Sequence, residues 1–185
     1  SWADWLRLRM RRLLVPTSTY LAVVTVAVAV AEDAGVSANN LYQAGWALAF
    51  QLWFLAAYAV LLVATPILHA AHRRWGVAIP VVMGAVAVAT SAVVAQWHWN
   101  LIGWANYVLV WGVFHQLGFA WHDGTLAGWR RPAWLAAASI AVLVGLIRWG
   151  PYPVSMVGVP GARIQNASPP SSALLAFGLA QSGLV

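Results

Sequence analysis

Long runs of apolar residues alternate along this chain with short segments that hold most of its charges. A helix needs about 20 apolar residues to cross the hydrocarbon core of a bilayer, which is about 30 Å thick. The pattern predicts spans at Leu13–Ala31, Trp46–Leu68, Val77–Ala95, Trp104–Trp121 and Pro132–Ile147, and a truncated sixth at Ser171–Val185. We therefore expect residues 1–185 to form a single all-α transmembrane domain, a polytopic helical bundle of about six spans.

The arginines give this bundle an orientation. The chain has ten arginines and no lysine, and eight of the ten fall on one predicted side of the membrane, at positions 7, 9, 11, 12, 73, 74, 130 and 131. The other side holds Arg148 and Arg163 with the acidic Glu32 and Asp33. Because cytoplasmic loops are enriched in Lys and Arg, we expect the N-terminal arginine cluster to be cytoplasmic and the protein to reside in the plasma membrane.

The composition supports a lipid environment and excludes several classes of function. Hydrophobic residues make up 62% of the chain and charged residues only 8%, whereas about a quarter of the residues in a soluble domain are charged. The net charge of +6 does not indicate nucleic-acid binding, because the arginines lie in short clusters between apolar runs. The absence of cysteine excludes disulfides, thiolate metal sites and a cysteine nucleophile.

The segment between the last two predicted spans differs from the other loops. Residues 149–170 contain five of the nine prolines, so they do not favour a helix. They also contain several large apolar residues, which a plain solvated linker would lack. We expect an ordered extracytoplasmic loop that packs back on the bundle, with an irregular connector as the alternative.

Polar residues inside the apolar runs are the candidates for chemistry, because such groups are costly in lipid. His115 and Gln116 lie in the predicted fourth span, and His122 follows seven residues later on the same helical face. This face would line a polar cavity; the alternative is a neutral His115 that bonds a neighbouring helix. His69 and His72 are expected at the membrane interface. Their alternative role as metal or haem ligands with His115 lacks a supporting carboxylate or thiol, so we expect no metal.

The N-terminal arginines have two interpretations. Arg9 and Arg12 are three residues apart, so on a helix they share a face and could clamp a phosphate. The alternative is that they only fix topology and contact anionic lipid. The chain lacks the nucleophile elbow, the phosphate-binding loop and the His-Glu-x-x-His zinc motif. Asn166-Ala167-Ser168 fits a glycosylation sequon, a pattern that is frequent by chance.

Several segments, in their order and spacing, resemble membrane acyltransferase family 3, and in particular an actinobacterial branch of it. The first is an Arg-x-x-Arg-Leu-Leu-x-Pro run that opens a span on the cytoplasmic side in that family. The matching segments are RMRRLLVP at 9–16, LWFL at 52–55, NYVLVW at 106–111, FHQLG at 114–118, WHDG at 121–124 and GPYPVSMVGVPG at 150–161. The resemblance covers nearly the whole chain.

This resemblance implies an enzyme that uses acyl-CoA from the cytoplasm and O-acylates a cell-envelope glycan or a lipid-linked acceptor. It implies that Arg9 and Arg12 handle the donor, and we expect Trp53, His115 and Gln116 to line the cavity. Members of the family have about ten spans, and their catalytic pair is an Arg followed eleven residues later by a His. That pair is not found in this chain. We therefore expect the chain to be a central fragment, inactive alone, with the catalytic histidine upstream of Ser1.

Two functions of other classes stay open at the level of sequence. The first is a multi-pass transporter or flippase in which His115 relays protons. The second is a non-catalytic membrane subunit that stabilises a partner complex. The leading hypothesis is the acyltransferase, with acetyl as the favoured acyl group and with membrane lipid, acyl-CoA and a glycan or glycolipid as partners.

Overall fold

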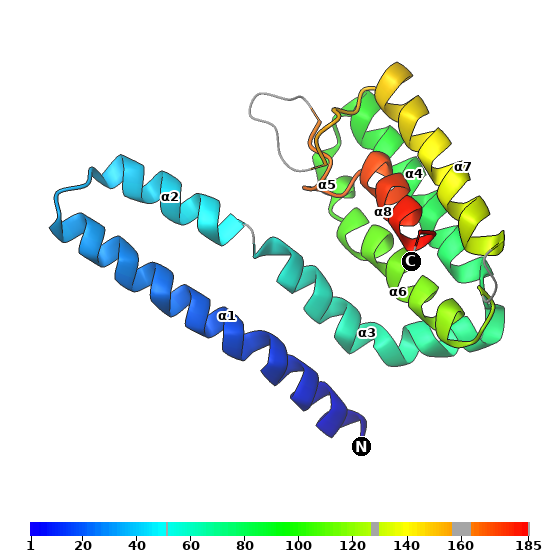
Figure 1. The fold of residues 1–185 in the computed structure, drawn as a ribbon, viewed down its shortest axis with the longest axis horizontal. Coiled ribbons are helices and arrows are strands. Elements are labelled where there is room, and N and C mark those ends of the chain that lie inside the picture. The colour runs from blue at the N-terminus through cyan, green and yellow to red at the C-terminus, as the bar shows by residue number, and fades with distance from the viewer. Residues whose placement is uncertain (51, 127–129, 157–163, 185) are drawn as a thin grey trace. The chain divides into compact units, whose positions relative to one another are not determined.

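The protein is built from helices. The structure, a computed structural model, describes residues 1–50, 52–126, 130–156 and 164–184. Within them the only β-structure is an isolated bridge between Ala167 and Pro170, and the all-α fold class is confirmed. The elements, shown in Figure 1, are α1 (Trp2–Asp33), α2 (Ala38–Phe50), α3 (Trp53–Trp75), α4 (Ala78–Trp97), α5 (Asn100–Gly103), α6 (Asn106–His122), α7 (Arg130–Trp149) and α8 (Ser172–Ser182).

Four helices in the described part of the chain are long and apolar enough to cross a membrane: Trp2–Asp33, Phe54–Trp75, Ala78–Trp97 and Pro132–Trp149. The membrane character of the protein follows from them. The other two predicted spans are also helical but shorter. At about 1.5 Å per residue, α6 with 17 residues is about 25 Å long and α8 with 11 residues about 16 Å. That these two cross the bilayer stays a prediction.

One predicted element was wrong. The apolar run Trp46–Leu68 was expected to be one span, but α2 ends at Phe50 and α3 begins at Trp53. A continuous apolar run indicates a lipid environment. It does not show where one helix ends and the next begins unless a Pro or Gly lies at the break. The predicted first span, Leu13–Ala31, lies within α1.

The chain divides into two units, Ser1–Ala64 and Thr65–Val185. In the first unit α1 and α2 lie side by side and run in opposite directions (Figure 1). The Tyr20 hydroxyl on α1 donates a hydrogen bond to Leu48 O on α2 at 3.4 Å. No residue of α1 is buried within the described chain.

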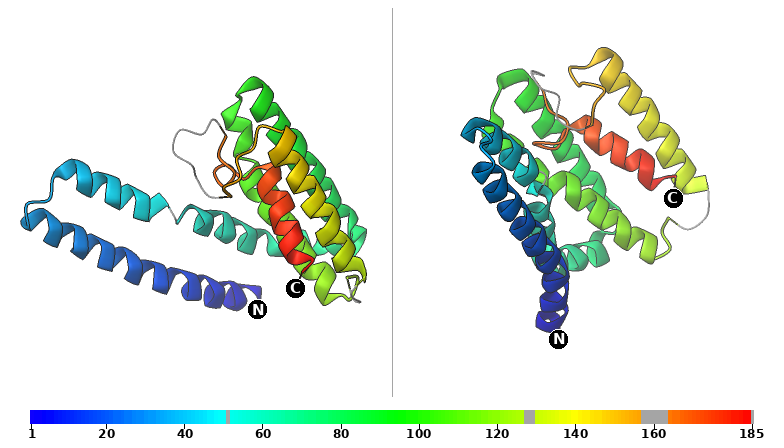
Figure 2. Two further views of the ribbon diagram at one scale, coloured as in Figure 1. Left: turned by 45° about the horizontal axis from the view of Figure 1, so that its top comes forward. Right: turned by 60° about the vertical axis from the view of Figure 1, so that its left-hand side comes forward.

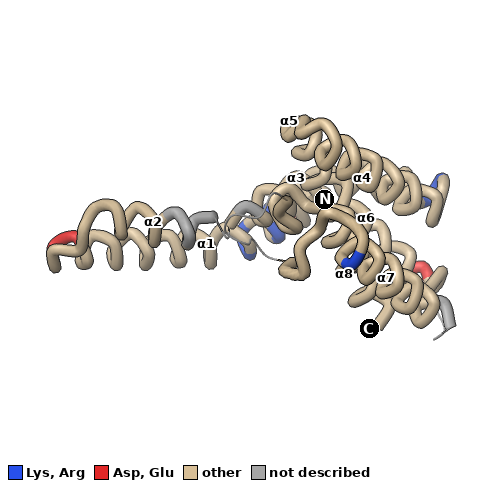
Figure 3. Tube along the Cα trace, turned by 90° about the horizontal axis from the view of Figure 1, so that it is seen from above, with Lys and Arg blue, Asp and Glu red and all other residues tan. Residues whose placement is uncertain are grey.

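The second unit has the compact core of the protein. In it α4 packs on α6, and α7 packs on α8, as the two views of Figure 2 show. The core is built from small and branched side chains: Ala87, Val110, Val113 and Leu175. In the described part of this unit, Arg and Asp residues lie at or near the helix ends (Figure 3). Arg73 and Arg74 close α3, and Asp123 follows α6.

Asn166 organises the described part of the loop between α7 and α8. It is fully buried, and its Nδ2 donates hydrogen bonds to Pro153 O at 2.8 Å and Ser155 O at 2.9 Å. Its Oδ1 accepts a bond of 2.8 Å from the Ser171 hydroxyl, which also caps α8. A fully buried amide with these partners does not serve as a glycosylation acceptor, so the sequon is a chance match.

The same loop is fastened to α6. Asn106, at the start of α6, donates hydrogen bonds to Ser91 Oγ and to Pro170 O, both at 2.9 Å. The Tyr107 hydroxyl lies 2.5 Å from Ser168 Oγ. Residues 157–163 lie outside the described residues, and the extracytoplasmic position of the loop stays a prediction.

Candidate functional site

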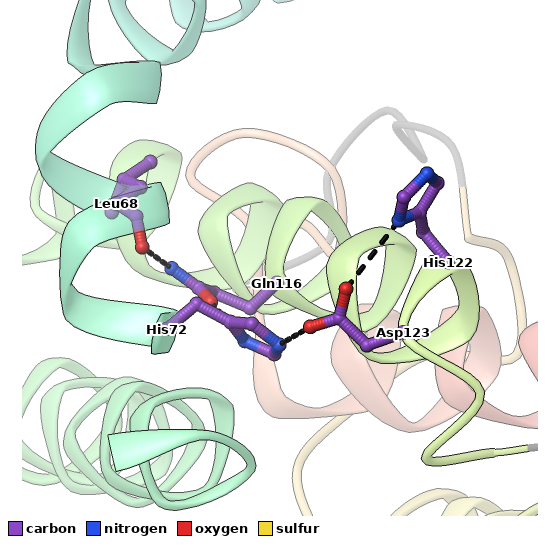
Figure 4. Close-up of polar contacts among 5 residues, drawn as sticks. All are labelled: Leu68, His72, Gln116, His122 and Asp123. Carbon is purple, nitrogen blue, oxygen red and sulfur yellow. Dashed lines mark hydrogen bonds and ion pairs between the residues drawn. The ribbon is translucent and has the colours of Figure 1, made fainter. Parts of the chain in front are cut away.

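Polar side chains gather where the last turns of α3 meet the C-terminal half of α6. His72 comes from α3, Gln116 from α6, and Asp123 caps the end of α6 (Figure 4). All belong to the second unit. Because helix backbones satisfy their own hydrogen bonds, these side chains must find partners in one another or in backbone groups of the facing helix.

Gln116 is fully buried and contacts α3 through both ends of its amide. Its Nε2 donates a hydrogen bond of 2.9 Å to Leu68 O, and its Oε1 lies 3.0 Å from His72 Nδ1. A backbone carbonyl accepts and never donates. The contact with Leu68 therefore fixes the orientation of the amide, so His72 Nδ1 must carry the hydrogen of the second bond.

The other ring nitrogen of His72 faces a carboxylate. His72 is 4% exposed, and its Nε2 lies 3.1 Å from Asp123 Oδ2. Asp123 Oδ1 lies 3.4 Å from Nδ1 of the exposed His122. The hydrogen bond from His122 lowers the pKa of Asp123. Desolvation opposes the shift, and the hydrogen bond and charge of His72 add to it. The lowered pKa keeps the Asp123 carboxylate ionised at neutral pH.

A phenyl ring lies among three histidines next to this pair. The ring centroid of Phe119 is 5.2 Å from that of His69, 5.5 Å from that of His72 and 4.9 Å from that of His115. His115 Nε2 also lies 3.1 Å from the Thr65 hydroxyl on α3. The α3–α6 contact is thus a continuous array of rings and hydrogen bonds. Among the described residues, no group of three or more His, Asp or Glu side chains could hold a metal ion.

The donor-binding residues predicted from the sequence lie in the first unit. Arg9 and Arg12 are exposed and lie on the helix α1, so they share a face, while their binding of the donor stays a prediction. The Arg9 guanidinium carbon lies 5.4 Å from the ring centroid of Trp5. Trp53 begins α3, but its side chain lies outside the described residues. The role of Trp53, His115 and Gln116 in lining a cavity stays a prediction.

Two residues of the α3–α6 contact were missed at the level of sequence. His72 was assigned to the membrane interface, but it is buried, because α6 covers it and supplies two hydrogen-bond acceptors. Asp123, which the sequence analysis did not single out, lies in the turn that follows α6. The available signal was its position at the end of α6, where a carboxylate meets the negative end of the helix dipole and needs a cationic partner.

This array joins α3 to α6 through hydrogen bonds and places the buried ring of His72 next to a carboxylate that is half exposed. A family model described as an acyltransferase domain matches residues 1–185. Searches of the curated proteins and of the solved structures found no match. A match of this extent agrees with the motifs noted above, and the chain belongs to acyltransferase family 3.

Proposed function

We propose that this protein is the central membrane part of an enzyme that transfers an acyl group from acyl-CoA to a hydroxyl of a cell-envelope glycan or a lipid-linked acceptor. Acetyl is the favoured acyl group. The family match over residues 1–185 carries this proposal, because it assigns the chain to an acyltransferase. The four long apolar helices support a membrane location. The arginine distribution favours the plasma membrane with a cytoplasmic N-terminal cluster.

Arg9 and Arg12 are the residues proposed to bind the donor phosphates. Both side chains are exposed on α1, and a separation of three residues places them on one face, about 4.5 Å apart along the axis. A planar guanidinium binds phosphate oxygens through two parallel hydrogen bonds. The contact of Arg9 with Trp5 directs its side chain toward the N-terminal end of α1, which restricts its freedom before a ligand binds.

Trp53, His115 and Gln116 are proposed to line the cavity that receives the acyl group. Support for His115 is its bond to Thr65 and its contact with Phe119, which fix its ring. The family pattern assigns the base that accepts the hydroxyl proton to the histidine of an Arg/His pair, which residues 1–185 do not contain. Residues 1–185 would then supply donor binding and the cavity rather than the base, and would be inactive alone.

The test uses the full-length protein in lipid nanodiscs with labelled acetyl-CoA and an envelope glycan acceptor. We expect label on the acceptor together with release of CoA. Arg9→Ala and Arg12→Ala should each raise the KM for acyl-CoA about tenfold or more, since a hydrogen bond to a charged group contributes about 1.5–3 kcal/mol.

Arg11→Ala is the matched control. It removes the same charge from the same segment, but Arg11 lies about 200° around the helix from Arg9. A KM that rises equally for Arg11→Ala and Arg9→Ala would reduce the cluster to a topology signal. An intact protein that never consumes acyl-CoA would overturn the whole proposal.

A further inference from the structure

The hydrogen bonds around His72 determine how many protons its ring carries. Gln116 Oε1 faces Nδ1 at 3.0 Å, and Asp123 Oδ2 faces Nε2 at 3.1 Å. Both oxygens are acceptors. Gln116 Oε1 is an acceptor because the amide nitrogen of the same side chain donates to Leu68 O, and Asp123 Oδ2 is one because a carboxylate has no hydrogen. A neutral imidazole has one N–H and one nitrogen lone pair. It can donate to one of the two oxygens, but its bare nitrogen then faces the lone pair of the other oxygen, which is repulsive.

We infer that His72 is a buried imidazolium that ties α3 to α6, and that the tie requires its second ring proton. The inference concerns the ring protons of His72, a residue to which the proposed acyl transfer assigns no role, although its partner Gln116 is also a proposed cavity residue. Figure 4 shows the arrangement: the ring lies between the amide of Gln116 and the carboxylate of Asp123, while His122 approaches the same carboxylate from its other oxygen.

The field around the ring favours a cation on balance. His72 lies in the last turn of α3, where the unpaired carbonyls of a helix end attract positive charge. Asp123 contacts it directly, and the ring of Phe119 lies 5.5 Å away, within the range of a cation–π contact. Arg73 and Arg74, the next residues on the same helix, oppose it, but both are exposed and screened by their surroundings.

The remaining titratable groups near the ring are histidines. His122 contacts the carboxylate of Asp123, which in turn contacts the His72 ring. His69 and His115 contact the ring of Phe119, which also lies next to His72. Helix α4, which follows α3, has no titratable side chain. Asp123 is therefore the described group whose charge decides the second proton of His72.

Loss of that proton has a mechanical consequence. With a bare Nε2 or Nδ1, the ring repels the carboxylate or the amide oxygen, and the end of α3 loses a bond to α6. The tie is thus present while His72 holds two ring protons and weakens as rising pH removes one. This direction is opposite to that of Asp123, whose own contribution weakens as pH falls.

The test is a pH titration of the full-length protein in nanodiscs by NMR, with ¹⁵N in the histidine rings and in the glutamine side-chain amides. The signals lost in His72→Asn and Gln116→Leu identify the two reporters. We expect the Gln116 amide signal to shift at the pH at which His72 loses its second ring proton. Two ring protons on His72 and an unshifted Gln116 signal over the whole range also support the inference. A ring with one proton beside an unshifted Gln116 signal overturns it.

Asp123→Asn gives an independent arm. The asparagine amide can donate a hydrogen bond to a bare Nε2, so the tie should persist with a neutral ring. Where the wild-type Gln116 signal shifts with His72, a shift of the same size in Asp123→Asn would also overturn the inference. Asp4→Asn, which removes an exposed carboxylate of the first unit, is the matched control and should change neither signal.

Discussion

Replacing Gln116 with leucine would test how strongly the polar contact between α3 and α6 stabilises the second unit. Leucine has a similar volume, so the change leaves little cavity and acts through hydrogen bonds. It removes the bond to Leu68 O and the bond from His72 Nδ1. The first loss is small, because a carbonyl inside a helix keeps its helical hydrogen bond. The second loss leaves the Nδ1–H of His72 without a hydrogen-bond acceptor, and this side chain is only 4% exposed.

The size of the effect depends on which loss dominates. Interhelical hydrogen bonds in membrane proteins contribute about 0.6 kcal/mol on average, so the two bonds alone would give about 1 kcal/mol. A buried donor left unpaired costs about 1–3 kcal/mol, and more if it is charged. Because His72 is covered by α6 and cannot turn to water, we expect the desolvation cost to dominate. The free energy of unfolding should fall by about 2 kcal/mol.

Reversible unfolding in mixed micelles, followed by circular dichroism, measures this difference. Gln96→Leu is the matched control, because it makes the same replacement at an exposed position on α4. It should stay within about 0.5 kcal/mol of the wild type, as surface substitutions do. If Gln116→Leu is as stable as Gln96→Leu, the hydrogen bonds of Gln116 do not hold α3 to α6, and the reasoning fails.

Three further predictions concern other parts of the second unit. Gly183→Ala should lower the free energy of unfolding by about 1–3 kcal/mol, because its methyl group would overlap backbone atoms of α7; Gly118→Ala, with nothing within 4 Å, should not destabilise the protein in the same assay. The pKa of Asp123 is lowered by its bond from His122, so the stability it adds is present at neutral pH and lost as pH falls through its folded-state value. Melting temperatures across pH should show this acid loss in the wild type and less of it in Asp123→Asn. Asn166→Ala should make the loop before α8 sensitive to protease under conditions in which the wild type is resistant, because three buried hydrogen bonds are lost.

The sequence determined the elements of this protein and its family. Apolar runs of about 20 residues must be helical in lipid, because only a helix satisfies every backbone group within one segment. This is why α4 and α7 lie where the hydropathy pattern put them, within a few residues. The order of the short motifs, from the N-terminal arginine run to the loop after α7, led to the family that the comparison then confirmed.

Only the tertiary structure decided which polar residues meet. A helix surrounded by lipid is apolar on all sides, so its sequence does not reveal which face turns inward. His72 and Asp123 are 51 positions apart, and neither belongs to a motif that would pair them. Asn166, which has the sequence of a glycosylation site, became the centre of a buried loop. The burial and partners of a single side chain depend on how two helices are rotated against each other, and that rotation is set by packing over the whole unit.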